Sequence, residues 1–156
     1  MLNSQLRSLN ISLLRNLRKT QCYITLEPLI LEKKELEVGD FIFFEKLNFF
    51  AKNSKGIVGK LKLGKKEDKE GFLVTEVFEV PKKEEIILDK NFMILEFRVG
   101  AISKEMLKER NWIEFKWKIS DGLICFLENK PVAVGVLGES EDGFCIKIIE
   151  ENIFYE

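Results

Sequence analysis

The segment that comes closest to a ligand-binding motif is Gly-Lys-Leu-Lys-Leu-Gly-Lys-Lys, at residues 59–66. It matches a phosphate-binding P-loop as far as Lys65, but Lys66 stands where a P-loop has the Ser or Thr that ligands Mg²⁺. Lysine and leucine also alternate here, which predicts a β-strand, whereas a P-loop needs a turn that leads into a helix. The pattern therefore argues against nucleotide binding.

The same basic segment could instead contact a nucleic-acid backbone. Phe49 and Phe50 precede it, and aromatic side chains of this kind stack on bases in small OB-like barrels. A similar stretch later in the chain, residues 136–139, has no lysine, so only one of the two segments would bind. A solvated hairpin is the simpler interpretation, and a nucleic-acid-binding β-barrel is the alternative from another functional class.

Residue types that many enzymes and metal sites use are missing. The 156 residues include no His, which is the commonest general base and metal ligand at neutral pH. Cys22, Cys125 and Cys145 show no CxxC spacing, so neither a zinc site nor a disulfide framework is indicated. Lys and Arg number 25 against 26 Asp and Glu, so no global field attracts nucleic acid. We expect no enzymatic activity, no metal and no cofactor.

The elements that carry these side chains occur twice, at about residues 22–79 and 93–151. A shift of 71 residues aligns Ile24 and Ile42 with Leu95 and Ile113. Shifts of 76 and then 72 align residues 47–59 with 123–135 and residues 71–79 with 143–151, which implies a longer loop after residue 59. Units of about 60 residues are marginal alone, so they should pack on each other or on another chain.

Each unit is predicted to consist mainly of short strands. These are expected at residues 23–26, 41–44, 47–51, 57–63 and 72–78, and again at 94–99, 112–118, 123–128, 132–137 and 144–149. Helix-forming residues predict short helices at 31–36 and at 103–110, the second capped by Ser103. Pro81 and the charged residues after it predict a linker over residues 81–91, between units at 21–80 and 92–156.

Residues 1–20 form a separate basic segment. Five leucines share one helical face, which predicts an amphipathic helix: Leu2, Leu6, Leu9, Leu13 and Leu17. Such a helix could cover the first unit, connect to another domain, lie on a membrane or act as a transit peptide. No stretch approaches the ~18 apolar residues of a membrane helix, so we expect no stable membrane insertion.

Two predicted strands, residues 41–44 and 123–127, are apolar at consecutive positions. Both faces of such strands must be covered. A small unit has too little material to cover them, so the pattern predicts an interlocked partner.

Taken in order, these motifs resemble the SpoA domain, the module of the flagellar switch proteins FliM and FliN and of the SctQ component of type III secretion. The resemblance rests on residues 36–42, 53–59 and 71–76 in the first unit and on 107–113, 128–136 and 143–148 in the second. It covers about residues 22–151. Arg110-Asn111 departs from the family's Gly-Asp turn, and the charged segment 65–70 is similar to the FliM-like version.

The resemblance implies a mainly β fold in which two tandem SpoA units form an intertwined pseudo-dimer, as in the C-terminal part of SctQ. It implies a structural component of the cytoplasmic sorting platform, or C-ring, of a type III secretion apparatus. Its partners would be a stator protein of the SctL or FliH type, which connects to the export ATPase, copies of itself or SpoA-containing isoforms, and other sorting-platform proteins. A flagellar switch protein is the alternative within the family.

The family's exposed apolar patch follows the hairpin glycine. By position, this patch is Val136, Leu137 and Gly138 in the second unit and Leu61 and Leu63 in the first, where lysines interrupt it. The second unit is therefore the better candidate for an apolar anchor, although Val136 and Leu137 could equally be core residues. The expected intertwined core comprises Phe41, Ile42, Phe50, Trp112, Ile113, Phe126 and Phe144.

Overall fold

The computed structural model describes residues 22–84, 86, 88–115 and 118–151, which form a mainly β structure. The first group of strands is β1 (Tyr23–Leu26), β2 (Leu29–Glu32), β3 (Phe41–Phe44), β4 (Phe49–Asn53), β5 (Gly56–Lys66) and β6 (Lys69–Lys82). The second is β7 (Phe92–Ala101), β8 (Trp112–Glu114), β9 (Leu123–Leu127), β10 (Lys130–Ser140) and β11 (Gly143–Glu151). Two 3-10 turns, η1 (Lys104–Met106) and η2 (Ile119–Asp121), flank β8.

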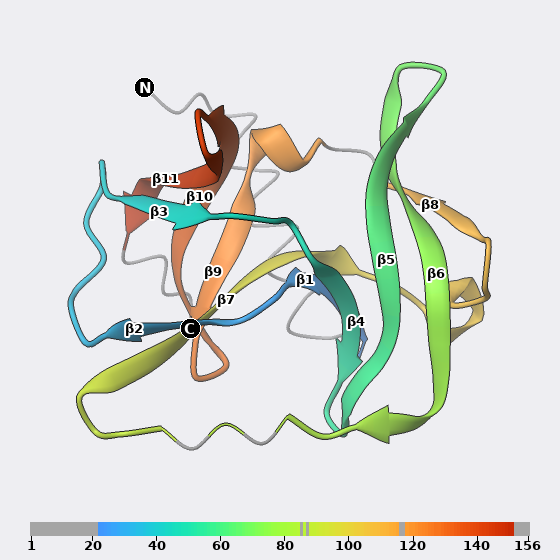
Figure 1. Ribbon diagram of the computed structural model, residues 1–156, viewed down its shortest axis with the longest axis horizontal. Helices are drawn as coiled ribbons and strands as arrows, with labels where there is room; N and C mark the ends of the chain where they lie inside the picture. Colours follow the sequence, from blue (N-terminus) through green and yellow to red (C-terminus); the bar gives the residue numbers. More distant parts are fainter. Residues whose placement is uncertain (1–21, 85, 87, 116–117, 152–156) are drawn as a thin grey trace.

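All eleven strands belong to one antiparallel sheet, in the order β3-β11-β10-β9-β7-β1-β4-β5-β6-β8, with β2 also paired to β7. In Figure 1, β9, β10 and β11 lie on the left, β4, β5 and β6 lie on the right, and β1 and β7 lie between them. The two end strands do not stay with their sequence neighbours. β3 precedes β4 but pairs with β11, and β8 precedes β9 but pairs with β6.

Tight turns close the long hairpins. Glu67 and Asp68 adopt φ angles of 52° and 64° between β5 and β6, and Glu128 and Asn129 adopt 49° and 68° between β9 and β10. Paired positive φ values are typical of two-residue hairpin turns that follow the twist of the strands. The longer loop expected after residue 59 is absent, because β5–β6 and β10–β11 both close with two residues.

The two short helices that we predicted are not present as such. Residues 104–106 form only the single turn η1, and Ser103 makes no side-chain cap hydrogen bond. In the 31–36 segment, Leu31 and Glu32 belong to β2, which pairs with β7. At Leu31 and Glu32, strand pairing has therefore overridden local helix propensity. The amphipathic helix predicted within residues 1–20 lies outside the described residues.

The main core is shared by both groups of strands. Phe44 of β3 contacts Phe97 of β7 edge to face, with ring centroids 6.0 Å apart, and Phe49 of β4 contacts Phe72 of β6 at 5.0 Å. Such pairs add to the burial of the rings themselves. The end strand β3 is therefore anchored in the core through Phe44.

The two consecutively apolar strands differ in their cover. In β9, Leu123 and Cys125 join the main core, while Ile124 and Phe126 are buried in a second cluster with Val134, so the prediction that both faces are covered is confirmed there. In β3 the prediction was wrong. Ile42 and Phe44 are buried, but Phe41 and Phe43 are 52% and 67% exposed, because this end strand is covered on one face only.

Candidate functional site

The structure separates the residues of the predicted partner patch. On β10, Val136 and Leu137 are half-buried and Gly138 is exposed. On β5, Leu61 is only 5% exposed and belongs to the main core, and Leu63 is half-buried and packs against that core. Leu61 is thus inaccessible, because the exposed lysines alternate with it along the strand and take the solvent side.

Alternation along β10 also divides the patch in the second unit. Leu137 packs against the main core, so Val136 and Gly138 lie on the opposite face of the sheet. Sequence position alone had grouped all three residues together. Val136 and Gly138 are the two that can contribute to an outer surface.

This surface continues from β10 over β11 to the end strand β3. In register, Val136 lies beside Lys147 of β11, which lies beside Phe41 of β3; Gly138 likewise lies beside Cys145, which lies beside Phe43. We call these six residues the β3–β11–β10 face. It is built by residues that are far apart in the sequence, from β3 and from β10 and β11.

The exposed side chains of this face are mostly apolar. The rings of Phe41 and Phe43 are stacked with centroids 6.5 Å apart, and the Lys147 ammonium lies 5.8 Å from the Phe41 ring centroid. Exposed aromatic rings beside an aliphatic residue and one cation are suited to an apolar segment that also carries an acidic group. Phe41, which we expected in the core, instead belongs to this surface.

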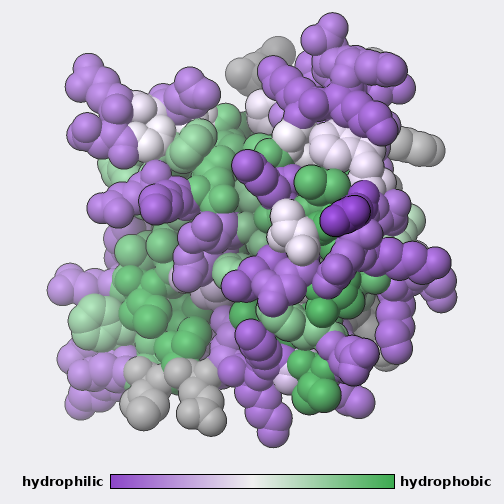
Figure 2. All heavy atoms as spheres, turned by 45° about the vertical axis from the view of Figure 1, so that its right-hand side comes forward, coloured by the Kyte–Doolittle hydropathy of each residue, from purple (hydrophilic) through white to green (hydrophobic). Residues whose placement is uncertain are grey.

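The corresponding surface on β5, β6 and β8 is more polar, although Leu73 is 38% exposed on it. Lys60 Nζ lies 3.7 Å from Glu76 Oε2, and Lys62 lies beside Leu73, which lies beside Trp112. The Trp112 ring covers Gly71 so closely that an added Cβ would lie 2.6 Å from its Cζ2 atom. Hydrophilic side chains also cover much of the face seen in Figure 2, with hydrophobic areas between them. The two groups of strands therefore present unlike surfaces.

The remaining residues of the predicted core are placed as follows. Ile42, Ile113 and Phe126 are buried, and Phe50, Trp112 and Phe144 are half-buried. Ile42 and Ile113 lie on the two exchanged strands. Of the two aromatic residues considered for stacking on nucleic acid, Phe49 is only 2% exposed, so its ring is not available to a base, and Phe50 is half-buried.

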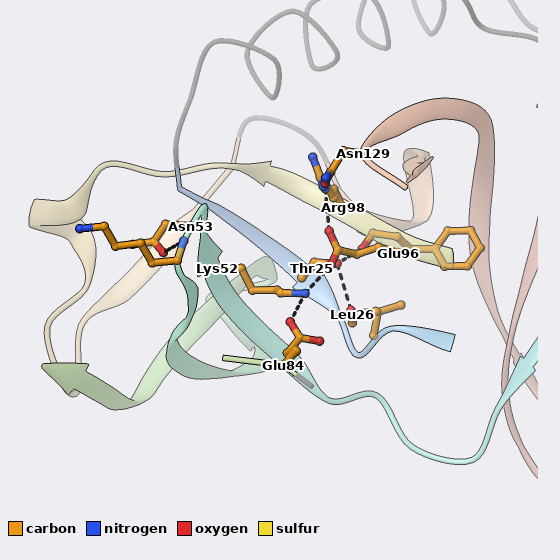
Figure 3. Close-up of polar contacts among 10 residues, drawn as sticks. Thr25, Leu26, Lys52, Asn53, Glu84, Glu96, Arg98 and Asn129 are labelled. Atoms are coloured by element: carbon orange, nitrogen blue, oxygen red, sulfur yellow. Dashed lines mark hydrogen bonds and ion pairs between the residues drawn. The ribbon is translucent and has the colours of Figure 1, made fainter. Parts of the chain in front are cut away.

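Sequence reasoning missed a buried cluster of charges where the two groups of strands meet (Figure 3). Lys52 Nζ donates to Glu96 Oε2 at 2.5 Å and also forms an ion pair with Glu84. Arg98 Nε donates to Glu96 Oε1 at 2.7 Å, and its guanidinium lies 4.0 Å from the Tyr23 ring centroid and 3.9 Å from that of Phe126. The available signal was three charged residues embedded in apolar strands.

The cluster lies at a groove of about 1190 Å³ and fixes the protonation of its central carboxylate. Burial would raise the pKa of Glu96, but the charges and hydrogen bonds of Lys52 and Arg98 outweigh burial and hold it below the ordinary value. Every charged side chain in the cluster forms an ion pair with another member. Arg98 Nη2 also donates to Asn129 Oδ1 at 2.9 Å, in the β9–β10 turn. The cluster therefore fixes β1, β4, β7 and this turn relative to one another.

Other kinds of site are not evident in the described part of the chain. It contains no group of three or more Cys, Asp or Glu side chains placed to hold a metal ion. None of its helical segments has the length and apolar character needed to cross a membrane. A comparison of the sequence with protein-family models and with curated proteins finds no match.

Proposed function

We propose that the chain is a non-catalytic assembly module in which two SpoA-like units exchange one strand each. The strand order of the sheet carries this proposal. If β1, β3, β4, β5 and β6 are matched with β7, β8, β9, β10 and β11, the order is the same from either end. The exchanged strands β3 and β8 then occupy equivalent places at the two ends.

The registers agree with this match. Ile24 of β1 pairs with Ala51 of β4. Shifts of 71 and 76 residues, which align the two copies in the sequence, convert this pair into Leu95 and Leu127, which are paired between β7 and β9. An intertwined pseudo-dimer accounts for both the sequence repeat and the exchanged strands.

On this architecture, the chain would act as a structural component of a type III secretion sorting platform at the cytoplasmic face of the apparatus. The β3–β11–β10 face would dock the N-terminal segment of a stator protein of the SctL or FliH type. Exposed Phe41 and Phe43 support this assignment, because aromatic side chains often supply most of the energy of a protein interface. On the charged surface of β5 and β6 the apolar candidate is Leu73, which is less exposed, at 38%.

Fluorescence anisotropy with a labelled SctL-type N-terminal peptide tests the docking role. We expect Val136→Asp to weaken binding by at least about tenfold, because a buried charge would replace an apolar contact. Lys62→Asp, on the corresponding strand β5, should leave binding unchanged. If Val136→Asp is folded and binds as well as the original chain, the peptide does not dock on this face.

A salt titration with a single-stranded oligonucleotide separates this function from nucleic-acid binding. Phosphate contacts weaken steeply as salt rises. We expect no binding even at low salt. Salt-sensitive binding that Lys62→Asp abolishes would favour the nucleic-acid alternative.

A further inference from the structure

β3 has a free edge. It is the end strand of the sheet, and no other strand of the described residues pairs with its outer side. An unpaired edge presents backbone donors and acceptors that can bind a strand of another chain. The other end strand, β8, has only three residues, and the half-buried Trp112 packs over its neighbour β6.

The hydrogen bonds of the described chain show which residues of β3 face outward. Ile148 of β11 directs both backbone groups toward β3, donating to Asp40 O and accepting from Gly39 N, each at 2.8 Å. Alternate residues of an antiparallel strand bond to the same neighbour, so the register partners of Ile146 and Phe144, which are Ile42 and Phe44, are bonded to β11. Phe41 and Phe43 therefore direct their N–H and C=O groups to the free edge.

This edge lacks the usual protection against pairing. Natural edge strands commonly carry lysine, proline or inward charges, but β3 reads Phe-Ile-Phe-Phe. The two residues whose backbone groups face outward also have the exposed rings, at 52% and 67%. Main-chain bonding and aromatic contact would thus favour the same occupant, a second extended strand.

We propose that two copies of the chain pair through β3, antiparallel, about a two-fold axis at Ile42. Phe41 of each copy then lies opposite Phe43 of the other, so two aromatic cross-strand pairs form. The pattern of β3 therefore favours pairing with β3 of a second copy.

Pairing of this kind is closed. A two-fold contact uses the same surface on both copies, so both β3 edges are consumed and no chain of copies grows. The two β3–β11–β10 faces then join into one continuous apolar surface that contains four phenylalanines. The pairing does not depend on the stator, since it can form with this chain alone.

Sedimentation equilibrium of the full chain tests the pairing. We expect a dimer that dissociates on roughly hundredfold dilution, as mass action requires. Phe43→Pro should be monomeric throughout, because proline removes the outward N–H without touching the bonds to β11. Phe43→Thr is the matched control: it keeps the N–H, and its dissociation constant should rise by about tenfold through loss of the two aromatic pairs.

Phe43→Lys is a second monomeric variant if Phe43→Pro fails to fold, because a lysine blocks an edge by charge. Hydrogen exchange should show the Phe41 and Phe43 amides protected only in the dimer. A chain that is monomeric at every concentration, or a folded Phe43→Pro that dimerises normally, overturns the proposal. Protection of both amides in the monomer also overturns it, since another segment of the same chain would then cover β3.

Discussion

Phe43 of β3 lies directly opposite Cys145 of β11, so a strand from the first unit is paired with the last described strand of the second. The reverse contact is made by β8, whose Ile113 lies opposite Phe72 of β6. Each end of the sheet therefore joins a strand from β1–β6 to a strand from β7–β11. Folding, stability and partner binding should all depend on this exchange.

The first prediction concerns the pairing of β3 with β11. Phe43 and Cys145 form a non-hydrogen-bonded pair, whose Cα atoms lie about 4.5 Å apart in an antiparallel sheet. This separation suits a disulfide. We expect Phe43→Cys to form an intramolecular disulfide with Cys145 on mild oxidation, detected by mass spectrometry of peptides and by the monomer band on a non-reducing gel.

The control for this prediction is the double variant Phe43→Cys with Cys145→Ser, which should retain a free thiol at residue 43. In the Phe43→Cys variant, a disulfide between positions 43 and 145 that is found only between two chains would mean that β3 is exchanged between molecules. In that case the pairing described within one chain would be contradicted.

The second prediction concerns residues 91–156 expressed alone. This fragment contains β8 but lacks β3, so β11 has no partner on its outer side. If β3 and β8 are equivalent, β8 of one copy can take the place of β3 beside β11 of another. We expect an intertwined dimer in sedimentation analysis, and a stable, well-folded monomer would contradict the equivalence.

The third prediction concerns the buried charges. Glu96→Gln removes the carboxylate between Lys52 and Arg98, whose side chains are about 9% and 8% exposed. Loss of one member of a buried ion network typically destabilises a protein strongly. We expect the free energy of unfolding to fall by about 3 kcal/mol in urea titrations. Lys60→Met, which breaks an exposed ion pair with Glu76, should change it by less than about 1 kcal/mol.

The fourth prediction follows from the lowered pKa of Glu96. Because the folded-state pKa lies below the ordinary value of 4.5, ionised Glu96 contributes its full stabilisation above pH 4.5. This contribution should decline as the pH falls through the folded-state pKa. We expect the stability difference between the original chain and Glu96→Gln to be constant from about pH 7 to pH 5 and to shrink below pH 4.5. A difference that grows on acidification would reverse the inferred sign.

The fifth prediction concerns the contact of β8 with β6. A Cβ at Gly71 would lie 2.6 Å from the Trp112 ring and 2.8 Å from Ile113 O, so Gly71→Ala must displace β8. We expect a loss of about 1–3 kcal/mol in the free energy of unfolding. Gly138→Ala is the matched control, because its nearest atom, Cys145 Sγ, is 4.0 Å away and leaves room for a methyl group.

The positions of most strands could be predicted from the sequence, because apolar and aromatic runs bounded by turn residues mark them locally. The helices at 31–36 and 103–110 could not be excluded, since the pairing of Leu31 with Met93 is a long-range contact that local propensity does not encode. The exposure of Phe41 and Phe43 was missed for a similar reason. A consecutive apolar run shows that burial of both strand faces would be favourable. It does not show whether the same chain supplies the residues that bury them.

The candidate site was predicted in part. Val136 and Gly138 do lie toward the outer face, but their neighbours Phe41, Phe43 and Lys147 come from strands that only the exchanged pairing brings together. The cluster of Lys52, Glu96 and Arg98 depends on β4 and β7, which are far apart in the sequence, lying on either side of β1. Charged residues inside apolar strands indicate that charges are buried. The fold is needed to identify which oppositely charged residue pairs with each of them.

The placement of β3 has a consequence for synthesis on the ribosome. β3 leaves the ribosome about a hundred residues before its partner β11, so the Ile42 and Phe44 side chains stay unprotected until β11 has been made. β6 likewise cannot complete its pairing until β8 has been made. Contacts between such distant segments form slowly. The nascent chain would therefore be most open to chaperone binding and to misassociation until β11 emerges and can pair with β3.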